Sequence, residues 1–351
     1  MLSPTIEACS RGRDNNFKLL RLAAASLVIF GHSFSVVLGP SFVAPPAPWL
    51  PMSFGGLAVN IFFVLSGFLI AKSFDERGSV IAFIAARVLR IYPAAILAIL
   101  FTVFVVGWSF TTVPVRDFPT HPDVQSYLTR NLPLIFAPIR SSLPGVFATN
   151  PTSYGVNDPL WTLPYEMWMY GGVLVVGLLG LLRRRALFNS VAAAAIAGYW
   201  YCAIWRPDVL EGAAIGPLWR LAFFFLAGSL AYINRDRIRL SLVASAVAAG
   251  VVVAVHGQPW FVNVFDVALA YVVLVLAFVP GGAIRRFNKL GDYSYGLYVF
   301  GFPIQQSLIA LRPSLTWYAL FALSMAAGLC LAAVSWHCVE SPALRLKTRL
   351  A

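Results

Sequence analysis

Arg21 and His32 lie eleven positions apart inside the first long apolar segment of the chain. In an α-helix this spacing makes three turns plus about 20°, so both side chains share one face, about 16 Å apart along the axis. An arginine near the membrane surface suits an anion, and a deeper histidine suits proton transfer near neutral pH. The alternative is a snorkelling arginine and a histidine that is hydrogen-bonded to a neighbouring carbonyl.

Three further cations lie near the ends of apolar segments. Arg87 and Arg90, in RVLRIYP, are three residues apart and share a helix face. Two guanidinium groups there suit a phosphorylated ligand, and attraction to anionic lipid headgroups is the alternative. Lys72, at the end of the second apolar segment, has the same two interpretations.

Glu166, in LWTLPYEMWMY, is a carboxylate inside another apolar segment. Pro164 is expected to kink the helix there, because proline removes a backbone donor. A glutamate near His32 could orient the imidazole; alternatively, Glu166 neutralises Arg220 or another buried cation. The carboxylate, the expected kink and the neighbouring aromatic side chains together predict part of a pocket wall. These aromatic residues are Trp161, Tyr165, Trp168 and Tyr170.

The second apolar segment contains Asn60, Ser66 and Gly67. Such residues usually indicate close helix packing, and Asn60 and Ser66 are also candidate substrate contacts. Ser66 is a conceivable covalent carrier, which we do not favour. The four cysteines have no metal-ligand spacing, so no metal is predicted.

The amino-acid composition indicates the class of protein to which these residues belong. Of the 351 residues, 59% are hydrophobic and only 11% charged, whereas soluble domains carry about 25% charged residues. The sequence therefore predicts an all-α polytopic membrane protein with no separate soluble domain. The net charge of +12 does not indicate nucleic acid, because the basic residues form short patches between apolar runs.

About ten transmembrane helices are expected. A short amphipathic helix at 79–91 should precede the third, with a bend at Pro93. The predicted spans are 18–38, 55–73, 92–110, 160–182, 187–205, 215–233, 241–257, 263–280, 293–311 and 317–337.

Basic residues predict the orientation. Twenty of the 26 fall on one side if both termini are cytoplasmic. Residues 1–351 would then form a single membrane domain, with cytoplasmic tails at 1–17 and 338–351 and a long extracytoplasmic loop at 111–159. The predicted cytoplasmic basic residues are Arg11, Arg13, Lys18, Arg21, Lys72, Arg77, Arg87, Arg90, Arg183, Arg184, Arg185, Arg235, Arg237, Arg239, Arg285, Arg286, Lys289, Arg345, Lys347 and Arg349.

Taken together, these segments resemble the membrane-bound acyltransferase-3 family of bacteria. The resemblance rests on six motifs in order: RLAAASLVIFGHSF with Arg21 and His32, FFVLSGFLI (62–70), RVLRIYP (87–93), LWTLPYEMWMY (160–170), YSYGLYVFGFPI (293–304) and VESPALRL (339–346). Many relatives carry a histidine in the fifth motif where this chain has Gly301, so no role of that histidine is expected here.

The resemblance implies an O-acyltransferase of the bacterial inner (cytoplasmic) membrane. It would take an acyl group, most often acetyl, from cytoplasmic acyl-CoA to a sugar hydroxyl of a cell-surface or exported glycan, or of a lipid-linked sugar. Arg21, Lys72, Arg87 and Arg90 would bind the phosphates of acetyl-CoA, and His32 would act as general base.

Glu166 would orient His32 or bind the sugar. Acceptor recognition is expected at Asn60, Ser66, Trp161 and Tyr165 and in loop 111–159, including Tyr154. Two other classes remain: a transporter or flippase for a lipid-linked sugar, and a non-catalytic membrane assembly component.

Overall fold

The computed structural model describes residues 3–12, 14–39, 41–42, 49–76, 79–153, 155–210 and 216–346. Within these ranges the chain is helical apart from its loops, and the only β-type pairing there is an isolated antiparallel bridge between Thr5 and Arg239. Several residues considered above lie outside the described ranges: Arg13, Arg77, Tyr154, Lys347 and Arg349.

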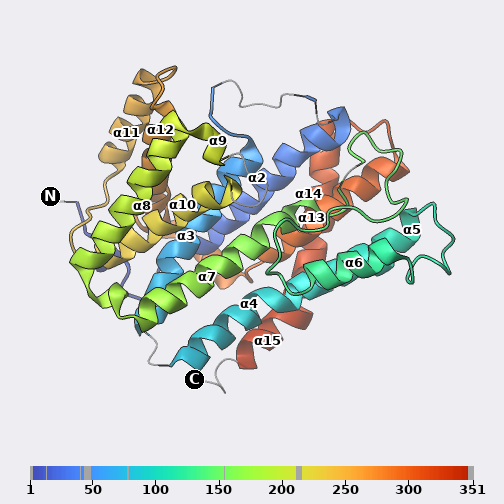
Figure 1. Cartoon of the computed structure of the whole chain (residues 1–351), viewed down its shortest axis with the longest axis horizontal. Coiled ribbons are helices and arrows are strands. Elements are labelled where there is room, and N and C mark those ends of the chain that lie inside the picture. The colour runs from blue at the N-terminus through green and yellow to red at the C-terminus, as the bar shows by residue number, and fades with distance from the viewer. Residues whose placement is uncertain are drawn as a thin grey trace. The chain divides into compact units, whose positions relative to one another are not determined.

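Each predicted span contains a helix (Figure 1). Seven helices of the described residues are long and apolar enough to cross a membrane; α7, α11 and α13 are not among them. The prediction of an all-α polytopic membrane protein is confirmed, whereas the number ten and the orientation stay predictions. The ten helices are α2 (Phe17–Leu38), α3 (Phe54–Glu76), α4 (Val80–Phe101), α7 (Leu163–Leu178), α8 (Arg185–Trp205), α10 (Gly216–Ile233), α11 (Leu242–Ala254), α12 (Phe261–Phe278), α13 (Ser294–Leu311) and α14 (Trp317–Ser335).

Helix α4 differs from the prediction. The expected amphipathic helix at 79–91 is not separate, because α4 runs without interruption through Pro93. It continues into the π-helical turn η1 (Thr102–Gly107) and the short α5 (Trp108–Phe110). In hydrocarbon no water can take up exposed backbone groups, so a helix persists through a proline that would often end it in water.

The expected kink at Pro164 is also wrong. Pro164 is the second residue of α7, which follows directly on the 3₁₀ turn η2 (Asp158–Thr162). The first N–H groups of a helix have no intrahelical acceptor, so proline is accommodated there without distortion. Glu166 consequently lies in the first turn of α7, where the helix dipole favours a negative charge.

The predicted outer loop between α5 and η2 is folded in its described residues. It contains α6 (Pro122–Asn131), and the Phe118 and Tyr127 side chains are fully buried. Gln306 of α13 anchors its far end: the side-chain amide donates to the carbonyls of Thr152 and Gly155 at 2.7 and 2.8 Å. The loop is therefore a fixed part of the structure near α13.

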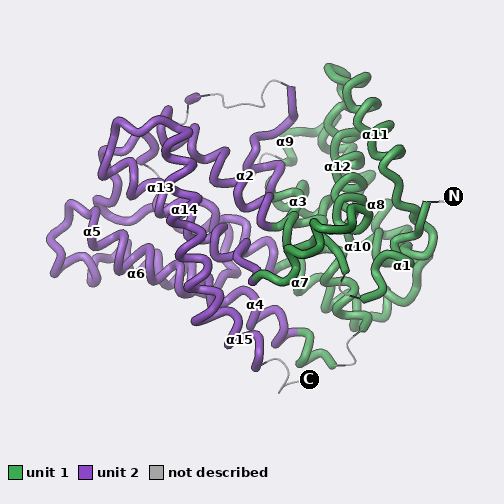
Figure 2. Tube along the Cα trace, turned by 180° about the vertical axis from the view of Figure 1, so that it is seen from behind, with its two compact units in different colours: residues 1–21, 59–83, 168–290 green, residues 22–58, 84–167, 291–351 purple. Residues whose placement is uncertain are grey.

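The chain forms two compact units, shown in different colours in Figure 2. Unit 1 comprises residues 1–21, 59–83 and 168–290, and unit 2 comprises residues 22–58, 84–167 and 291–351. Unit 1 includes α1 (Ile6–Cys9), α9 (Pro207–Leu210) and the 3₁₀ turns η3 (Leu181–Arg183) and η4 (Gly282–Lys289). Unit 2 includes α6, α13, α14, the π-helical turn η5 (Trp336–Glu340) and α15 (Ser341–Leu346).

In unit 1, helices α3 and α10 touch along their backbones. Gly67 lies so close to the Phe225 carbonyl, and Gly228 so close to the Val64 carbonyl, that neither position has room for a Cβ atom. The Ser229 hydroxyl completes the contact by donating to the Gly67 carbonyl at 3.1 Å. Gly67 thus serves close helix packing, the structural interpretation of its segment.

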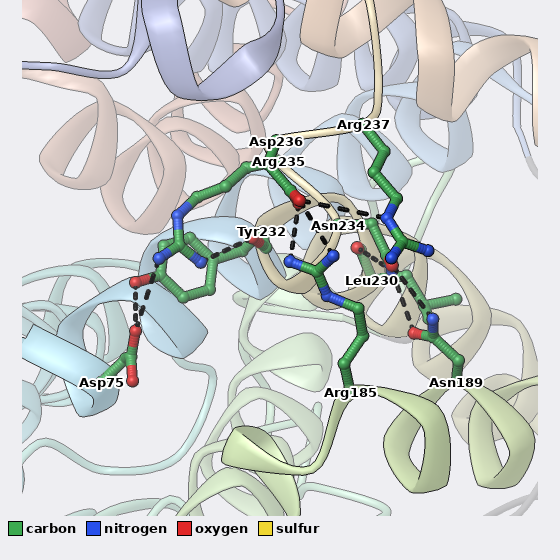
Figure 3. A network of polar contacts seen from close by, with 9 residues as sticks. All are labelled: Asp75, Arg185, Asn189, Leu230, Tyr232, Asn234, Arg235, Asp236 and Arg237. Carbon is green, nitrogen blue, oxygen red and sulfur yellow. Dashed lines mark hydrogen bonds and ion pairs between the residues drawn. The ribbon is translucent and has the colours of Figure 1, made fainter.

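Polar contacts join the ends of α3, α8 and α10 in unit 1 (Figure 3). Arg185 forms two parallel hydrogen bonds with the Asp236 carboxylate, at 2.9 and 2.7 Å, and holds the pKa of Asp236 below its usual range. The Tyr232 hydroxyl donates to Asp75 at 2.7 Å, and Asn189 and Asn234 exchange side-chain hydrogen bonds. These contacts fix the helix ends on the side that is predicted to be cytoplasmic.

The N-terminal segment packs against the same end of unit 1. The Leu240 amide donates to the Pro4 carbonyl at 2.8 Å, and the Ile6 amide donates to the Ile238 carbonyl at 2.9 Å. Ile6 is fully buried. The predicted tail 1–17 is therefore partly folded onto the helices.

Candidate active site

His32 lies in the wall that α2 and α13 form in unit 2. Its ring is half-buried and meets the Phe302 ring edge-on, with 4.9 Å between centroids. The Gln305 side chain ties the two helices together beside it, donating to the Ile29 carbonyl and to Ser33 Oγ, both at 2.8 Å. The helix carrying His32 is thus held rigidly at this level.

Gly301 belongs to the same helix contact. A Cβ atom there would lie 2.8 Å from the side chain of Ile29 in α2. A larger residue at position 301 would therefore require Ile29 to move. This close contact is consistent with a glycine, rather than a histidine, at this position of the fifth motif.

Asp158 is a further carboxylate of unit 2. It opens the turn η2, and the residues on either side of it are bound to α13. The Asn157 amide donates to the Val299 carbonyl at 2.9 Å, and the Tyr298 hydroxyl donates to the Pro159 carbonyl at 2.9 Å. The segment NDPLW indicates a turn but does not reveal its attachment to α13.

Glu166, Trp161 and Tyr165 also lie in unit 2, at the start of α7. Trp161 and Tyr165 meet edge-on with 5.8 Å between ring centroids, and Glu166 is half-buried. The Tyr298 hydroxyl of α13 hydrogen-bonds to η2 just before this turn: it donates to the Pro159 carbonyl at 2.9 Å and lies 2.7 Å from Thr162 Oγ1.

Arg87 and Arg90 lie on α4, and Arg90 joins three of the predicted motifs. Its guanidinium binds Asp292 Oδ2 at 2.8 Å and Glu340 Oε2 at 3.3 Å, and lies over the Tyr295 ring. The side chains of Asp292 and Glu340 are only 6% and 1% exposed, and that of Arg90 is 23% exposed. Two buried carboxylates therefore share one guanidinium.

Hydroxyl groups hold the other oxygens of these carboxylates. Ser294 donates to Asp292 Oδ1 at 2.6 Å, and Ser335 donates to Glu340 Oε1 at 3.0 Å. The contacts link α4 with the start of α13 and with η5. We call Arg90, Asp292 and Glu340 the arginine–carboxylate cluster.

The remaining predicted site residues belong to unit 1. Lys72 donates to the Ser10 carbonyl at 3.1 Å and lies 3.8 Å from Glu76. Asn60 is buried and Ser66 is half-buried in α3. Arg21 is half-buried, and because α2 is one uninterrupted helix, Arg21 and His32 occupy the same face of it.

Arg220 of α10 and Asp266 of α12 are charges of opposite sign that both belong to unit 1. In the part of the chain that the structure describes, no three His, Cys, Asp or Glu side chains lie together as a metal site.

Comparison with known proteins identifies the family. A family profile described as an acyltransferase domain matches residues 14–337, nearly the whole chain. The chain belongs to the acyltransferase-3 family. It is therefore an acyltransferase, and its apolar helices make it a multi-pass membrane member of that family.

Two curated relatives match this acyltransferase along almost its entire length. An "O-acetyl transferase" of Shigella phage Sf6 is 28% identical, with 93% of this chain and 95% of the relative covered. "Nodulation protein 10" of Rhizobium leguminosarum bv. viciae is also 28% identical, with 97% and 96% covered. No solved structure matches the chain significantly.

Proposed function

We propose that this membrane acyltransferase transfers an acetyl group from acetyl-CoA to a sugar hydroxyl of a cell-surface or exported glycan. A relative covering nearly the whole chain is named an O-acetyl transferase, which supports acetyl as the transferred group. The observation that carries the mechanism is His32, which is half-buried in the wall that α2 and α13 form and packs against the Phe302 ring. Family membership makes a transporter or a non-catalytic component the weaker interpretation.

His32 is the proposed general base. Its neutral imidazole takes the proton from the acceptor hydroxyl as that oxygen attacks the thioester carbonyl of acetyl-CoA. The new C–O bond forms and the C–S bond breaks. The proton then passes from the imidazolium to the CoA thiolate, which leaves as the thiol and returns His32 to its neutral form.

The donor is proposed to bind at the other end of α2. Arg21 lies about 16 Å along the helix from His32, which allows the CoA phosphates and the thioester to occupy the two levels. Arg87 is the second proposed phosphate ligand, because a guanidinium fork matches phosphate oxygens. Lys72 and Arg90 complete the proposed set, although Arg90 already binds two carboxylates.

The acceptor is proposed to bind near the first turn of α7. Trp161 and Tyr165 offer aromatic surfaces to a sugar ring, and the Glu166 carboxylate accepts hydrogen bonds from its hydroxyls. Asn60 and Ser66 are the proposed polar contacts from α3, and the folded loop 111–159 is the proposed glycan surface.

The lysine and arginine distribution supports placement in a bacterial inner membrane with cytoplasmic termini. In that orientation Arg21 and Arg87 face the compartment that contains acetyl-CoA, and η2 faces the exported glycan. The proposed partners are thus acetyl-CoA, a glycan or lipid-linked sugar, and membrane lipids.

The test uses purified protein, acetyl-CoA labelled in the acetyl group and a polysaccharide extract from the source organism. Label that enters the glycan and is released by mild alkali would identify an O-acetyl ester. No transfer of label, together with no binding of acetyl-CoA to the protein, would overturn the proposal in favour of a transporter.

A further inference from the structure

A groove of about 540 Å³ lies between α8 and α10 in unit 1. Its α8 wall consists of Ala193, Ile196, Ala197 and Trp200, which recur at helical spacing and therefore share one face of the helix. The two alanines leave space that larger side chains would fill. The volume of the groove lies within the range of pockets that hold small molecules, about 300–1,000 Å³.

The lining changes from polar to apolar along the groove. At one end, Asn189 and Asn234 exchange side-chain hydrogen bonds at 3.0 and 2.9 Å (Figure 3). Trp200 lines the other end, eleven residues further along α8, and its ring packs against that of Phe223 with 6.1 Å between centroids. Eleven residues of α-helix measure about 16 Å, which is about half of the roughly 30 Å hydrocarbon core of a bilayer. The groove therefore has the length of a single membrane leaflet.

Charged residues lie at the asparagine end of the groove. Arg185, one turn before Asn189 on α8, binds the Asp236 carboxylate at 2.9 and 2.7 Å. Arg237 directly precedes Ile238, which lines the groove, and Arg237 Nε lies 3.9 Å from Asp236 Oδ2. Together the two arginines and the aspartate carry one positive charge, and the Arg237 side chain is 73% exposed. An accessible cation is thus present at this end.

We propose that the groove binds a phospholipid with an anionic headgroup, with one acyl chain along the groove and the phosphate against Arg237. The order of cation, amide pair and apolar side chains matches a molecule that has an anion at one end and a hydrocarbon chain behind it. A guanidinium fork suits phosphate oxygens, and a basic residue near the membrane surface attracts anionic lipid. In the predicted orientation, the ligand is a lipid of the cytoplasmic leaflet.

Other occupants match the groove less well. A soluble phosphorylated molecule would leave its apolar length unused, and a hydrocarbon chain without a charged headgroup would leave the cation unused. The site includes none of the residues proposed to bind acetyl-CoA or the glycan, so it is independent of the transfer chemistry.

The experiment measures lipid bound to the purified protein in detergent by native mass spectrometry. Dilute phosphatidylglycerol or phosphatidylcholine with the same acyl chains is added, so that the two lipids differ in headgroup charge. We expect one phosphatidylglycerol molecule to bind at least about fivefold more tightly than phosphatidylcholine, the factor that one basic residue supplies near an anionic lipid. Equal affinity for the two lipids would overturn the proposal.

Two variants locate the bound lipid. Arg237→Gln should lower the affinity for phosphatidylglycerol by about fivefold and leave that for phosphatidylcholine unchanged, whereas Arg286→Gln, which alters an exposed arginine of η4, should bind as wild type does. Ala197→Phe fills the groove, so neither lipid should be retained. Its control is Ala195→Phe, which alters an exposed residue of α8 outside the groove and should leave binding unchanged.

Unchanged lipid binding in either Arg237→Gln or Ala197→Phe would overturn the proposal. Unfolding midpoints of the same samples show whether a variant is folded, and if Ala197→Phe is not, the comparison of Arg237→Gln with Arg286→Gln still decides. Excess glycerol phosphate should not displace phosphatidylglycerol; displacement would identify a phosphate site and overturn the assignment to a lipid. These measurements do not require acetyl transfer, so their failure is distinguishable from a failure of the proposed function.

Discussion

Replacing Arg90 by alanine tests the arginine–carboxylate cluster. The substitution removes the guanidinium that binds Asp292 at 2.8 Å and Glu340 at 3.3 Å. Both carboxylates are almost completely buried, so two negative charges would lose their counter-charge without gaining water. Removing one partner of a buried ion pair typically costs about 3–5 kcal/mol of folding free energy. Arg90→Ala should therefore destabilise the protein by about that amount.

The assay is unfolding of the purified protein in detergent, with Arg286→Ala as the matched control. Arg286 is exposed, so its loss should change stability by less than about 0.5 kcal/mol. The triple variant Arg90→Met, Asp292→Asn, Glu340→Gln should regain much of the lost stability, because it removes the uncompensated charges together. If Arg90→Ala unfolded like Arg286→Ala and lost only acetyl-CoA affinity, the structural role of the cluster would be refuted.

Three further predictions concern other parts of the molecule. Gly67→Ala should destabilise the protein by about 1–3 kcal/mol, because its Cβ would overlap the Phe225 carbonyl, whereas Gly171→Ala, with open space around it, should be neutral or stabilising; equal unfolding midpoints would contradict the α3–α10 contact. Arg185 lowers the pKa of Asp236 in the folded state, so this pair contributes stability above the unfolded-state pKa of about 3.9 and loses it as the pH falls further. Arg185→Gln should therefore be slightly less stable than wild type at pH 7, with the difference closing below about pH 4; a difference independent of pH would count against the pair. Trp161→Ala should lower kcat/KM for the glycan without changing the KM for acetyl-CoA, while the exposed Trp205→Ala should change neither; an unaltered acceptor dependence in Trp161→Ala would exclude contact with the sugar.

The helices could be predicted from the sequence because their cause is local. Apolar runs of about 20 residues must satisfy their backbone groups within the membrane, and every predicted span contains a helix. The separate helix expected before Pro93 and the kink expected at Pro164 were wrong because the consequence of a proline depends on its place in the helix. Pro93 lies in a continuous membrane helix, and Pro164 lies in a first turn where its missing donor is not needed.

The contacts of the site could be predicted less well, because they join residues that are distant in the chain. The spacing of Arg21 and His32 indicated one face of a helix, and α2 is one uninterrupted helix. Nothing local connects Arg90 with Asp292 or Glu340, and these contacts arise only when the start of α13 and η5 pack against α4. Arg90 was interpreted as a ligand because the sequence does not show the carboxylates that it meets.

The most direct test of the proposed mechanism compares His32→Ala with His256→Ala, an exposed histidine outside the site. Both variants are purified, and acetyl-CoA binding and acetyl transfer to the glycan extract are measured on the same samples. The account predicts that His32→Ala binds acetyl-CoA as wild type does but transfers at least about 100-fold more slowly, while His256→Ala retains both activities. Transfer by His32→Ala at a rate near that of wild type would contradict the role of His32 as general base.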